Sequence, residues 1–244
     1  KGLLMGGYER NSKAWRTSHE SLDSIPSDFN AKLLPEEWDR FEEIATNAAM
    51  RVPKMGEIGI KNFINGPEAF TPDNEFCLGE SSVGGFYIAA GFCAHGIAGA
   101  GGVGKVVAEW IVAGEPTMDL WHMDIKRFSE AYKSPKFTLD RVSENYEAYY
   151  DIHYPGEERQ SARGEKKSPI YDWHKENHAT FGEKAAWERV NFYYNPSESK
   201  LNETLRPHGW VGKNWHPAVA LEHHATRTSA GIYDESSFAK IEVT

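Results

Sequence analysis

The chain has 244 residues and a formal net charge of −9, and 26% of its residues are charged. This length suffices for one large or two small domains. The acidic balance argues against a sequence-independent nucleic-acid binder, which needs a basic face, and we expect no apolar run long enough to cross a bilayer. Cys77 and Cys93 lack metal-binding or redox spacing, so we expect a reducing compartment and no disulfide scaffold.

The N-terminal third is predicted to form three strands, one helix and connecting loops. Gly2–Glu9 has the pattern of a strand, and the polar stretch after it that of a loop. A helix is expected from Leu34 until Pro53 ends it, with acidic residues in its first turn and one apolar face in the core. Ile58–Ile64 alternates and predicts a second strand. Turns at 65–68 and 70–74 then lead to a short strand at 76–78.

The stretch Gly84–Gly114 organises the rest of the chain. Phe86–Ala90 is wholly apolar and predicts a buried strand. Six glycines follow within fourteen residues, and helical spacing then runs from Lys105 to Ala113 and stops at Gly114. A glycine-rich turn lets a flat ligand approach bare backbone, and the next helix presents unpaired N–H groups to it. The pattern predicts a cofactor-binding turn, and from spacing alone a turn without special chemistry is the alternative.

A dinucleotide-binding fingerprint is an attractive label, because Gly99, Gly101 and Gly104 match G-x-G-x-x-G. That fingerprint needs its first glycine directly after the strand, and an acidic residue at the end of a second strand about 20 residues later. Here eight residues separate Ala90 from Gly99, and Glu115–Asp124 is too polar for a parallel strand. We therefore reject the fingerprint.

The rest of the chain is predicted to form helices, a linker and strands. Helical spacing marks Asp124–Tyr132 and Thr138–Tyr150. Pro155–Lys167 is highly charged and predicts an exposed linker, the best domain boundary in the chain. Beyond it we expect a turn and a helix at 168–178, strands with a bend at 181–194, a loop at 195–215, a helix at 218–228, a turn at 231–234 and a strand at 238–243.

Few residues are candidates for metal or nucleophilic chemistry. His174 and His178 lie one helical turn apart, but the glutamate between them has the wrong offset for a metalloprotease and no third ligand is evident. A solvated helix face is the favoured interpretation, and His223 and His224 are an equally weak pair. Cys93 lies where a thiol could be activated, although a small packing residue is favoured. We predict no metal site.

A series of motifs in a fixed order is more specific than any single glycine pattern. The motifs are Asn65-Gly-Pro-Glu-Ala-Phe-Thr-Pro-Asp73, Gly91-Phe-Cys-Ala-His-Gly-Ile97, Ala100-Gly-Gly-Val-Gly-Lys105, Trp110-Ile-Val-Ala-Gly114, Asp124-Ile-Lys-Arg-Phe128, Ala162-Arg-Gly164, Ser168-Pro-Ile-Tyr-Asp172, Trp187-Glu-Arg189, Glu222-His223, and Asp234-Glu-Ser-Ser-Phe238 with Lys240. In this order they resemble the dimethylglycine and sarcosine dehydrogenase (oxidase) family, whose flavin-dependent amine oxidoreductase is fused to an aminomethyltransferase-like folate module. The resemblance favours the cofactor interpretation of the glycine-rich turn.

The resemblance implies an α+β fold in three parts. Residues 1–119 resemble the closing part of an FAD-dependent oxidoreductase domain with a mixed sheet, and residues 120–167 a small central linker domain. Residues 168–244 resemble the N-terminal part of an aminomethyltransferase domain that binds folate. Because the chain starts at Lys1 without an initiator methionine, we expect an internal fragment of a longer protein.

The resemblance also implies cofactor-binding residues. Those at the family's second flavin contact are Gly91, Phe92, Cys93, Ala94, His95, Gly96 and Ile97, and those near the same site in relatives are Pro67 and Glu68. The loop's amides and the dipole of the next helix are expected to face the flavin's pyrimidine edge, where negative charge develops. Ala98 stands where monomeric sarcosine oxidases carry a lysine for the substrate carboxylate, so the substrate anchor stays open. The resemblance identifies no catalytic residue.

By this resemblance the protein oxidatively demethylates an N-methylglycine, dimethylglycine or sarcosine, with FAD, and passes the one-carbon unit to tetrahydrofolate. Expected partners are the small N-methylated substrate and either oxygen or an electron-transfer flavoprotein, without nucleic acid or membrane. A non-catalytic regulator is the alternative, since the regulatory subunit of pyruvate dehydrogenase phosphatase resembles the same family. The expected location is the cytoplasm in a bacterium or the mitochondrial matrix in a eukaryote. We expect the 244-residue chain alone to be inactive.

Overall fold

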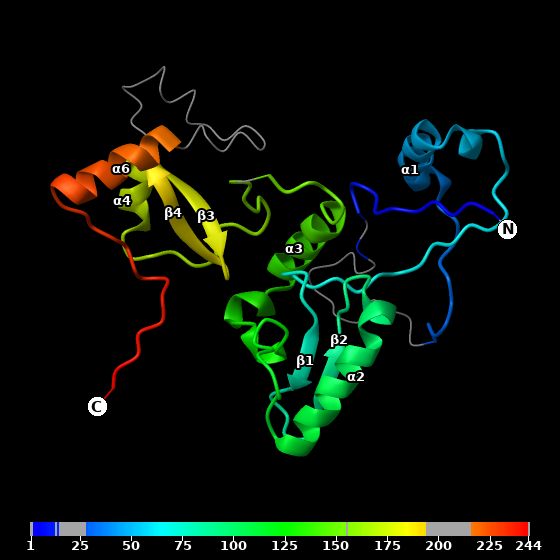
Figure 1. Cartoon of the computed structure of the whole chain (residues 1–244), viewed down its shortest axis with the longest axis horizontal. Helices are drawn as coiled ribbons and strands as arrows, with labels where there is room; N and C mark the ends of the chain where they lie inside the picture. Colours follow the sequence, from blue (N-terminus) through cyan, green and yellow to red (C-terminus); the bar gives the residue numbers. More distant parts are fainter. Residues whose placement is uncertain (1, 13, 15–27, 155, 194–215, 244) are drawn as a thin grey trace. The chain divides into compact units, whose positions relative to one another are not determined.

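The computed structural model describes residues 2–12, 14, 28–154, 156–193 and 216–243. Figure 1 labels the elements of two compact units, Lys1–Tyr150 and Asp151–Thr244. The α+β class is confirmed, with two two-stranded antiparallel sheets among the described residues. Among the described residues, parallel pairing consists of two isolated bridges, Leu78 with Asp124 in the first unit and Lys166 with Trp187 in the second. The domain limits at 119 and 167 stay a prediction.

Helix α1, Trp38–Arg51, confirms the first predicted helix, and Pro53 begins the short 3₁₀ helix η1, Pro53–Gly56. Its apolar face does not form the expected core, because none of its residues is buried. Trp38 packs on Phe63 with ring centroids 4.4 Å apart, yet is 48% exposed. The segments opposite the helix lack regular structure and leave an open cavity there.

The strands predicted at Gly2–Glu9 and Ile58–Ile64 are wrong, because both segments are irregular. Alternation predicts which side chains share a face, but a strand also needs backbone partners, which a local pattern cannot supply. Ile58, Ile60 and Ile64 are consequently 45%, 46% and 73% exposed. The turn expected at 70–74 is confirmed, since the Asn74 amide donates to the Thr71 carbonyl at 3.4 Å, whereas residues 65–68 form no regular turn.

Strands β1, Cys77–Glu80, and β2, Tyr87–Ala90, pair antiparallel with Leu78 opposite Ala89. The strand predicted at Phe86–Ala90 therefore forms, but the prediction that it is buried is wrong, because the last two residues of β2 are exposed; in β1, Leu78 is fully buried. A two-stranded sheet has few neighbours that can cover it, and Figure 1 shows α2 beside this hairpin. At Gly79, φ is +97° and an added Cβ would lie 2.3 Å from the Trp110 ring, so glycine is required for the helix to approach.

Helix α2, Gly96–Ala113, begins nine residues before the predicted start at Lys105. Each glycine inside a helix costs about 1 kcal/mol relative to alanine, so propensity alone predicts a turn. Packing decides otherwise, because Val106 and Trp110 are buried and Gly99 lies against Phe76. The predicted stop at Gly114 is confirmed by a left-handed C-cap with φ of +84°.

Helix α2 also changes the expectation about apolar runs. Over its 18 residues it is long and apolar enough to cross a membrane by length and composition, and 11% of that window is buried. The expectation that no such run exists is therefore wrong. Length and composition alone assign no membrane to the protein.

Two 3₁₀ helices, η2 at Ile125–Arg127 and η3 at Glu130–Lys133, replace the α-helix expected over 124–132. Helix α3, Pro135–Glu147, confirms the next predicted helix. Its start is set by Ser134, whose side chain accepts a hydrogen bond from the Phe137 amide at 3.3 Å. Phe137 and Asn145 are buried on its inner face.

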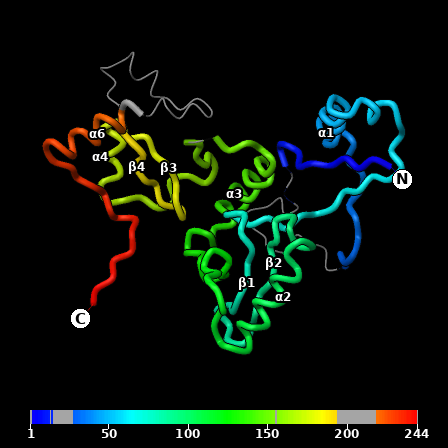
Figure 2. Tube along the Cα trace, in the orientation of Figure 1, coloured from blue at the N-terminus to red at the C-terminus, as the bar shows by residue number. Residues whose placement is uncertain are grey.

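The second unit contains α4, Tyr171–Glu176, the hairpin β3, Ala179–Lys184, with β4, Trp187–Tyr193, and α6, His216–Thr228. Figure 2 traces the two strands side by side. These elements confirm the predicted helices and strands, whereas the strand predicted at 238–243 is wrong because that segment is irregular. The loop predicted at 195–215 lies outside the described residues.

Candidate functional site

The loop before α2 has a strained backbone. Gly91, Cys93 and Ala94 have φ values of +63°, +45° and +66°. A Cβ at Gly91 would lie 2.7 Å from the Cγ2 atom of Thr71, so only glycine fits. Non-glycine residues with positive φ cost free energy and are held in place by their surroundings. Here the surroundings are tight, because Cys93 is 1% exposed.

The amides of this loop divide into two groups. Those of Cys93 and His95 donate to the carbonyls of Ala69 and Phe92 at 3.0 and 2.8 Å, so the protein already satisfies them. His95 caps α2 without a side-chain hydrogen bond to its first turn. The first-turn amides, with Ile97 99% exposed, therefore keep the positive end of the helix dipole open to solvent.

The segment that contains Pro67 and Glu68 lies against this loop. Besides the Ala69 carbonyl bond, the hydroxyl of Thr71 is 3.5 Å from the Cys93 sulfur. The buried Asn145 side chain donates to the Thr71 carbonyl at 3.0 Å. The structure thus brings the two predicted groups of cofactor-binding residues together through the backbone. It also supports the packing interpretation of Cys93, which like Cys77 is a free thiol.

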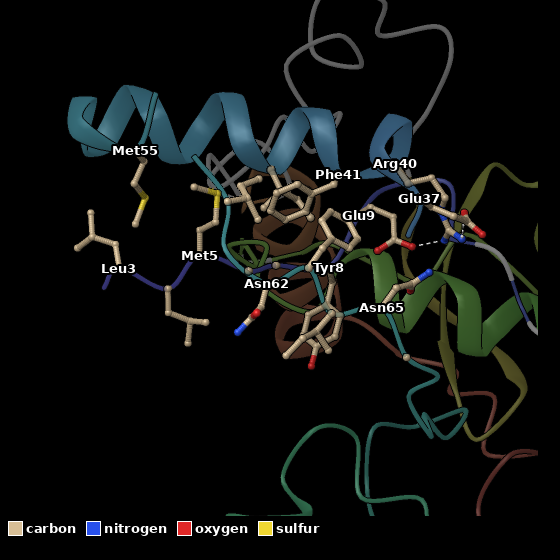
Figure 3. A pocket seen from close by; sticks show the side chains of 18 of the residues that line it. Leu3, Met5, Tyr8, Glu9, Glu37, Arg40, Phe41, Met55, Asn62 and Asn65 are labelled. Carbon is tan, nitrogen blue, oxygen red and sulfur yellow. Dashed lines mark hydrogen bonds and ion pairs between the residues drawn. The ribbon is translucent and has the colours of Figure 1, made fainter. Parts of the chain in front are cut away.

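A cavity of about 930 Å³ opens beside helix α1. Figure 3 shows Met5, Tyr8 and Phe41 among the side chains that line it. This volume lies within the range of small-molecule sites. Pro67 and Glu68 are part of its wall, but residues 91–97 are absent from the described lining.

The cavity's polar edge is built around Glu9. Glu9 forms an ion pair with Arg40, drawn as a dashed line in Figure 3, and accepts a hydrogen bond from the Tyr146 hydroxyl at 2.7 Å. Burial, followed by the bond to Glu9 and its charge, raises the pKa of Tyr146. Burial and then the charge of Glu68 raise the pKa of Tyr8 to about 12. Both tyrosines therefore stay neutral hydrogen-bonding groups near pH 7.

Sequence reasoning missed a partner of the loop. The hydroxyl of Tyr149 lies 2.7 Å from His95 Nδ1 and donates to the Cys93 carbonyl at 3.1 Å. Spacing gives no signal for a contact across 54 residues. Tyr149 also packs on Phe70, with ring centroids 5.2 Å apart.

A buried arginine fixes the turn that precedes the loop. Arg127 donates from Nε and Nη2 to the carboxylate of Asp73 at 2.7 and 2.8 Å. It also reaches the carbonyls of Glu75 and Asp124, at 3.0 and 3.1 Å. Burial lowers the pKa of Arg127, but the hydrogen bond and charge of Asp73 outweigh it, so the net shift is upward. This clamp orients Thr71 and hence the floor of the loop.

The second unit holds the predicted histidine pair, but only His174 is buried. Its Nδ1 faces the Tyr193 hydroxyl at 2.5 Å and its Nε2 faces Asp234 at 2.9 Å. Both ring nitrogens are therefore used inside the protein, and His178 is exposed. Within the described residues, no group of three or more His, Cys, Asp or Glu side chains could hold a metal.

Two motifs of the second unit meet in one ion pair. Arg163 Nε donates to Glu188 at 2.8 Å, its Nη2 donates to the other oxygen at 2.5 Å, and the Gly164 amide donates at 2.7 Å. Burial alone raises the pKa of Glu188, but the bonds from Arg163 and Gly164 outweigh it and hold that pKa below its usual range. The pair fastens the segment before α4 to the β3–β4 hairpin.

Three family models match consecutive parts of the chain. The model described as FAD dependent oxidoreductase matches residues 1–110, its central domain matches residues 113–168, and the GCVT N-terminal domain matches residues 170–244. Together these matches cover residues 1–110, 113–168 and 170–244, with two parts of the FAD dependent oxidoreductase class followed by a GCVT N-terminal domain.

Curated relatives match over almost all of the chain. It is 34% identical over 242 residues, 99% of the chain and 28% of the relative, to 4-methylaminobutanoate oxidase (formaldehyde-forming) of Paenarthrobacter nicotinovorans. It is 32% identical over 100% of the chain and 27% of the relative to the mitochondrial pyruvate dehydrogenase phosphatase regulatory subunit of Mus musculus. Identity is 30%, over 99% of the chain and 28% of the relative, with mitochondrial dimethylglycine dehydrogenase of Rattus norvegicus.

The chain belongs to the family of FAD-dependent oxidoreductases that includes sarcosine and dimethylglycine dehydrogenases. The ordered motifs had predicted this family. The chain spans about 28% of the length of the first of these relatives.

Proposed function

We propose that the full gene product containing this chain uses FAD to remove an N-methyl group from a small amino acid and passes the one-carbon unit to tetrahydrofolate. The observation that carries this proposal is the consecutive match of the three family models. The names of two relatives add support, because 4-methylaminobutanoate and dimethylglycine both carry N-methyl groups. The folate step rests on the GCVT match at residues 170–244.

The chain's own residues suit part of a flavin contact. The open first turn of α2 offers N–H donors and a positive dipole end, and the strained loop holds that turn beside Pro67 and Glu68. When bound, FAD supplies the acceptor for the two electrons that leave the substrate. If the flavin's ring edge lies at this turn, the amides of Gly96 and Ile97 would donate to it and stabilise its negative charge. Removing one such donor costs about 2.7–4 kcal/mol in oxyanion sites, which sets the expected scale.

A regulatory protein is the second candidate, because the pyruvate dehydrogenase phosphatase regulatory subunit is 32% identical over the whole chain. The visible spectrum of the full gene product separates the two. Under the proposal the purified protein is yellow, and its flavin absorbance bleaches when sarcosine, dimethylglycine or 4-methylaminobutanoate is added without oxygen. Glycine, which lacks the methyl group, is the matched control and leaves the spectrum unchanged. A colourless protein, or bleaching by none of the three amines, refutes the proposal.

The electron acceptor and the folate step need separate measurements. Reoxidation of the bleached protein by air identifies an oxidase, and reoxidation only by an electron-transfer flavoprotein identifies a dehydrogenase. Free formaldehyde should fall when tetrahydrofolate is present if the one-carbon unit is transferred. Unchanged formaldehyde would remove the folate part and leave the demethylation intact.

A further inference from the structure

The loop before α2 ends in a closed triangle of polar atoms. His95 Nδ1 is 2.8 Å from the Cys93 carbonyl and 2.7 Å from the Tyr149 hydroxyl, which is itself 3.1 Å from that carbonyl. Tyr149 comes from the segment after α3, and Cys93 and His95 come from the loop. Two groups thus hold the imidazole, the carbonyl of Cys93 two residues away and the hydroxyl of Tyr149 from 54 residues along the chain.

The triangle sets which nitrogen of His95 carries the proton. A carbonyl can only accept, so the neutral ring donates from Nδ1 to Cys93. Burial, then the charges of Tyr150, Cys93 and Glu68, raises the pKa of Tyr149, whose O–H also donates to that carbonyl. Within the described residues, the only hydrogen-bonding neighbour of Nε2 is Tyr149, at 3.1 Å and thus farther than from Nδ1. Nε2 keeps its lone pair, and because His95 is exposed a ligand can reach it.

The surroundings of this nitrogen suit a cation. Tyr149 packs with Tyr8 and Tyr150 at ring-centroid distances of 5.3 and 5.1 Å. Glu68 is close enough for its charge to act on both Tyr8 and Tyr149. Aromatic faces and a carboxylate attract ammonium groups. The main charges that act on Tyr8 and Tyr149 are those of Glu68, Cys93 and neighbouring tyrosines, all of which are neutral or negative.

We propose that His95 Nε2 accepts the ammonium proton of the N-methylated amine, with Tyr149 as the positioning residue that holds the imidazole. The inference rests on the proposed function, which supplies FAD as the oxidant. The substrate's N–H bond breaks, its proton binds Nε2, and the electron pair stays on nitrogen. The neutral amine can then release a hydride from its methyl carbon, giving an iminium cation that water converts to formaldehyde and the demethylated amine. An ammonium cannot do this, because its nitrogen has no lone pair.

The first test is the tautomer of His95 in the unmutated full gene product, labelled with ¹⁵N-histidine. Long-range ¹H–¹⁵N correlation spectra, with His95 assigned from its substitution, report the two ring nitrogens separately. We expect a protonated Nδ1 and an unprotonated Nε2 in the neutral ring. The opposite tautomer overturns the inference without any reference to flavin.

The second test measures anaerobic flavin bleaching by the amine in the full gene product. His95→Ala should slow the limiting bleaching rate by roughly 100-fold, and added free imidazole should restore part of it. Tyr149→Phe keeps the ring and should slow the limiting rate by roughly fivefold, with the dissociation constant of the amine unchanged and no rescue by imidazole. Tyr87→Phe, on β2, is the matched control and should match the wild type. Flavin content per protein is measured for each variant.

The outcomes of these tests distinguish a failure of this inference from a failure of the proposed function. If amines bleach the flavin and His95→Ala bleaches as fast as wild type, or imidazole gives no rescue, the inference fails and the proposed function stands. If no amine bleaches the flavin, the proposed function fails and the proton transfer fails with it. If His95→Ala loses its flavin, the tautomer and the Tyr149→Phe rate decide.

Discussion

Arg163→Met is expected to destabilise the β3–β4 hairpin more than Glu188→Gln, although both break the same ion pair. The side chain of Glu188 is 3% exposed and that of Arg163 is 26% exposed. Methionine leaves a buried carboxylate with the Gly164 amide as its remaining partner in the pair. Glutamine leaves a partly solvated guanidinium that still donates to the carbonyls of Arg159 and Phe181.

The size of the difference follows from these exposures. Removing one partner of a buried pair costs about 3–5 kcal/mol, and we expect about 3 kcal/mol for Arg163→Met because the Gly164 bond remains. For Glu188→Gln we expect about 1 kcal/mol, the usual scale of one hydrogen bond. A cost of about 3 kcal/mol corresponds to a roughly 100-fold rise in exchange rate for amides that open with the hairpin.

The assay is amide hydrogen exchange over β3 and β4 at two pH values. In the wild type the pKa of Glu188 is lowered, so its stabilisation is present above the pKa of the unfolded state and is lost as pH falls through the folded one. In Arg163→Met, burial still raises that pKa, while the hydrogen bond and charge of Arg163 no longer lower it and only the Gly164 amide and the charge of Lys167 do. We therefore expect the pKa of Glu188 to rise, so that protonation relieves the cost. The excess exchange, corrected for intrinsic rates, should therefore shrink between about pH 7 and about pH 4. Equal exchange in the two variants at neutral pH, or an excess that persists in acid, would refute the reasoning.

Three further changes test other parts of the structure. Gly91→Ala should lower the melting temperature, at a cost of about 1–3 kcal/mol, because of the positive φ at this position and the close contact of the added methyl group. Gly101→Ala has open space around it on α2 and should raise stability by about 1 kcal/mol. Equal melting temperatures of the two variants would contradict this difference. Arg127→Lys should melt almost as low as Arg127→Met, because lysine cannot make the two-pronged bond to Asp73, and full rescue by lysine would argue against the clamp. For Asp234, burial raises the pKa, but hydrogen bonds from neighbouring groups outweigh burial and lower the net pKa. The stability that Asp234 contributes to the fold is therefore present above about pH 3.9 and is lost as pH falls through the folded pKa. Asp234→Asn should thus flatten the acid side of a plot of melting temperature against pH.

Local patterns in the sequence predicted the elements whose partners lie close by in the chain. Helix α1, the stop at Gly114 and the two strands of the β3–β4 hairpin are all confirmed. The same patterns failed where distant partners decide. The segment Gly2–Glu9 forms no strand. Helix α2 includes the glycines that the sequence assigned to a turn, because Trp110 packs against the β1–β2 hairpin.

The sequence indicated which stretch of residues to consider as a candidate site, but not which side chains meet there. The glycine spacing and the ordered motifs pointed to residues 91–97, yet neither can report that Tyr149 meets His95 or that Arg127 meets Asp73. Such pairs depend on how the chain folds back on itself. The motif around Arg163 and that around Glu188 were both visible in the sequence, but their bond was not.

The first unit bears on how proteins of this kind can be recombined. The family models divide it between residues 110 and 113, yet hydrogen bonds join residues on the two sides of that junction. The bonds run between Leu78 and Met123, Asp73 and Arg127, Thr71 and Asn145, Cys93 and Tyr149, and Glu9 and Tyr146. A chimeric gene joined between residues 110 and 113 would take the two partners of each bond from different parents. A junction beside Asp151 would keep the partners of all five bonds in one parent's sequence.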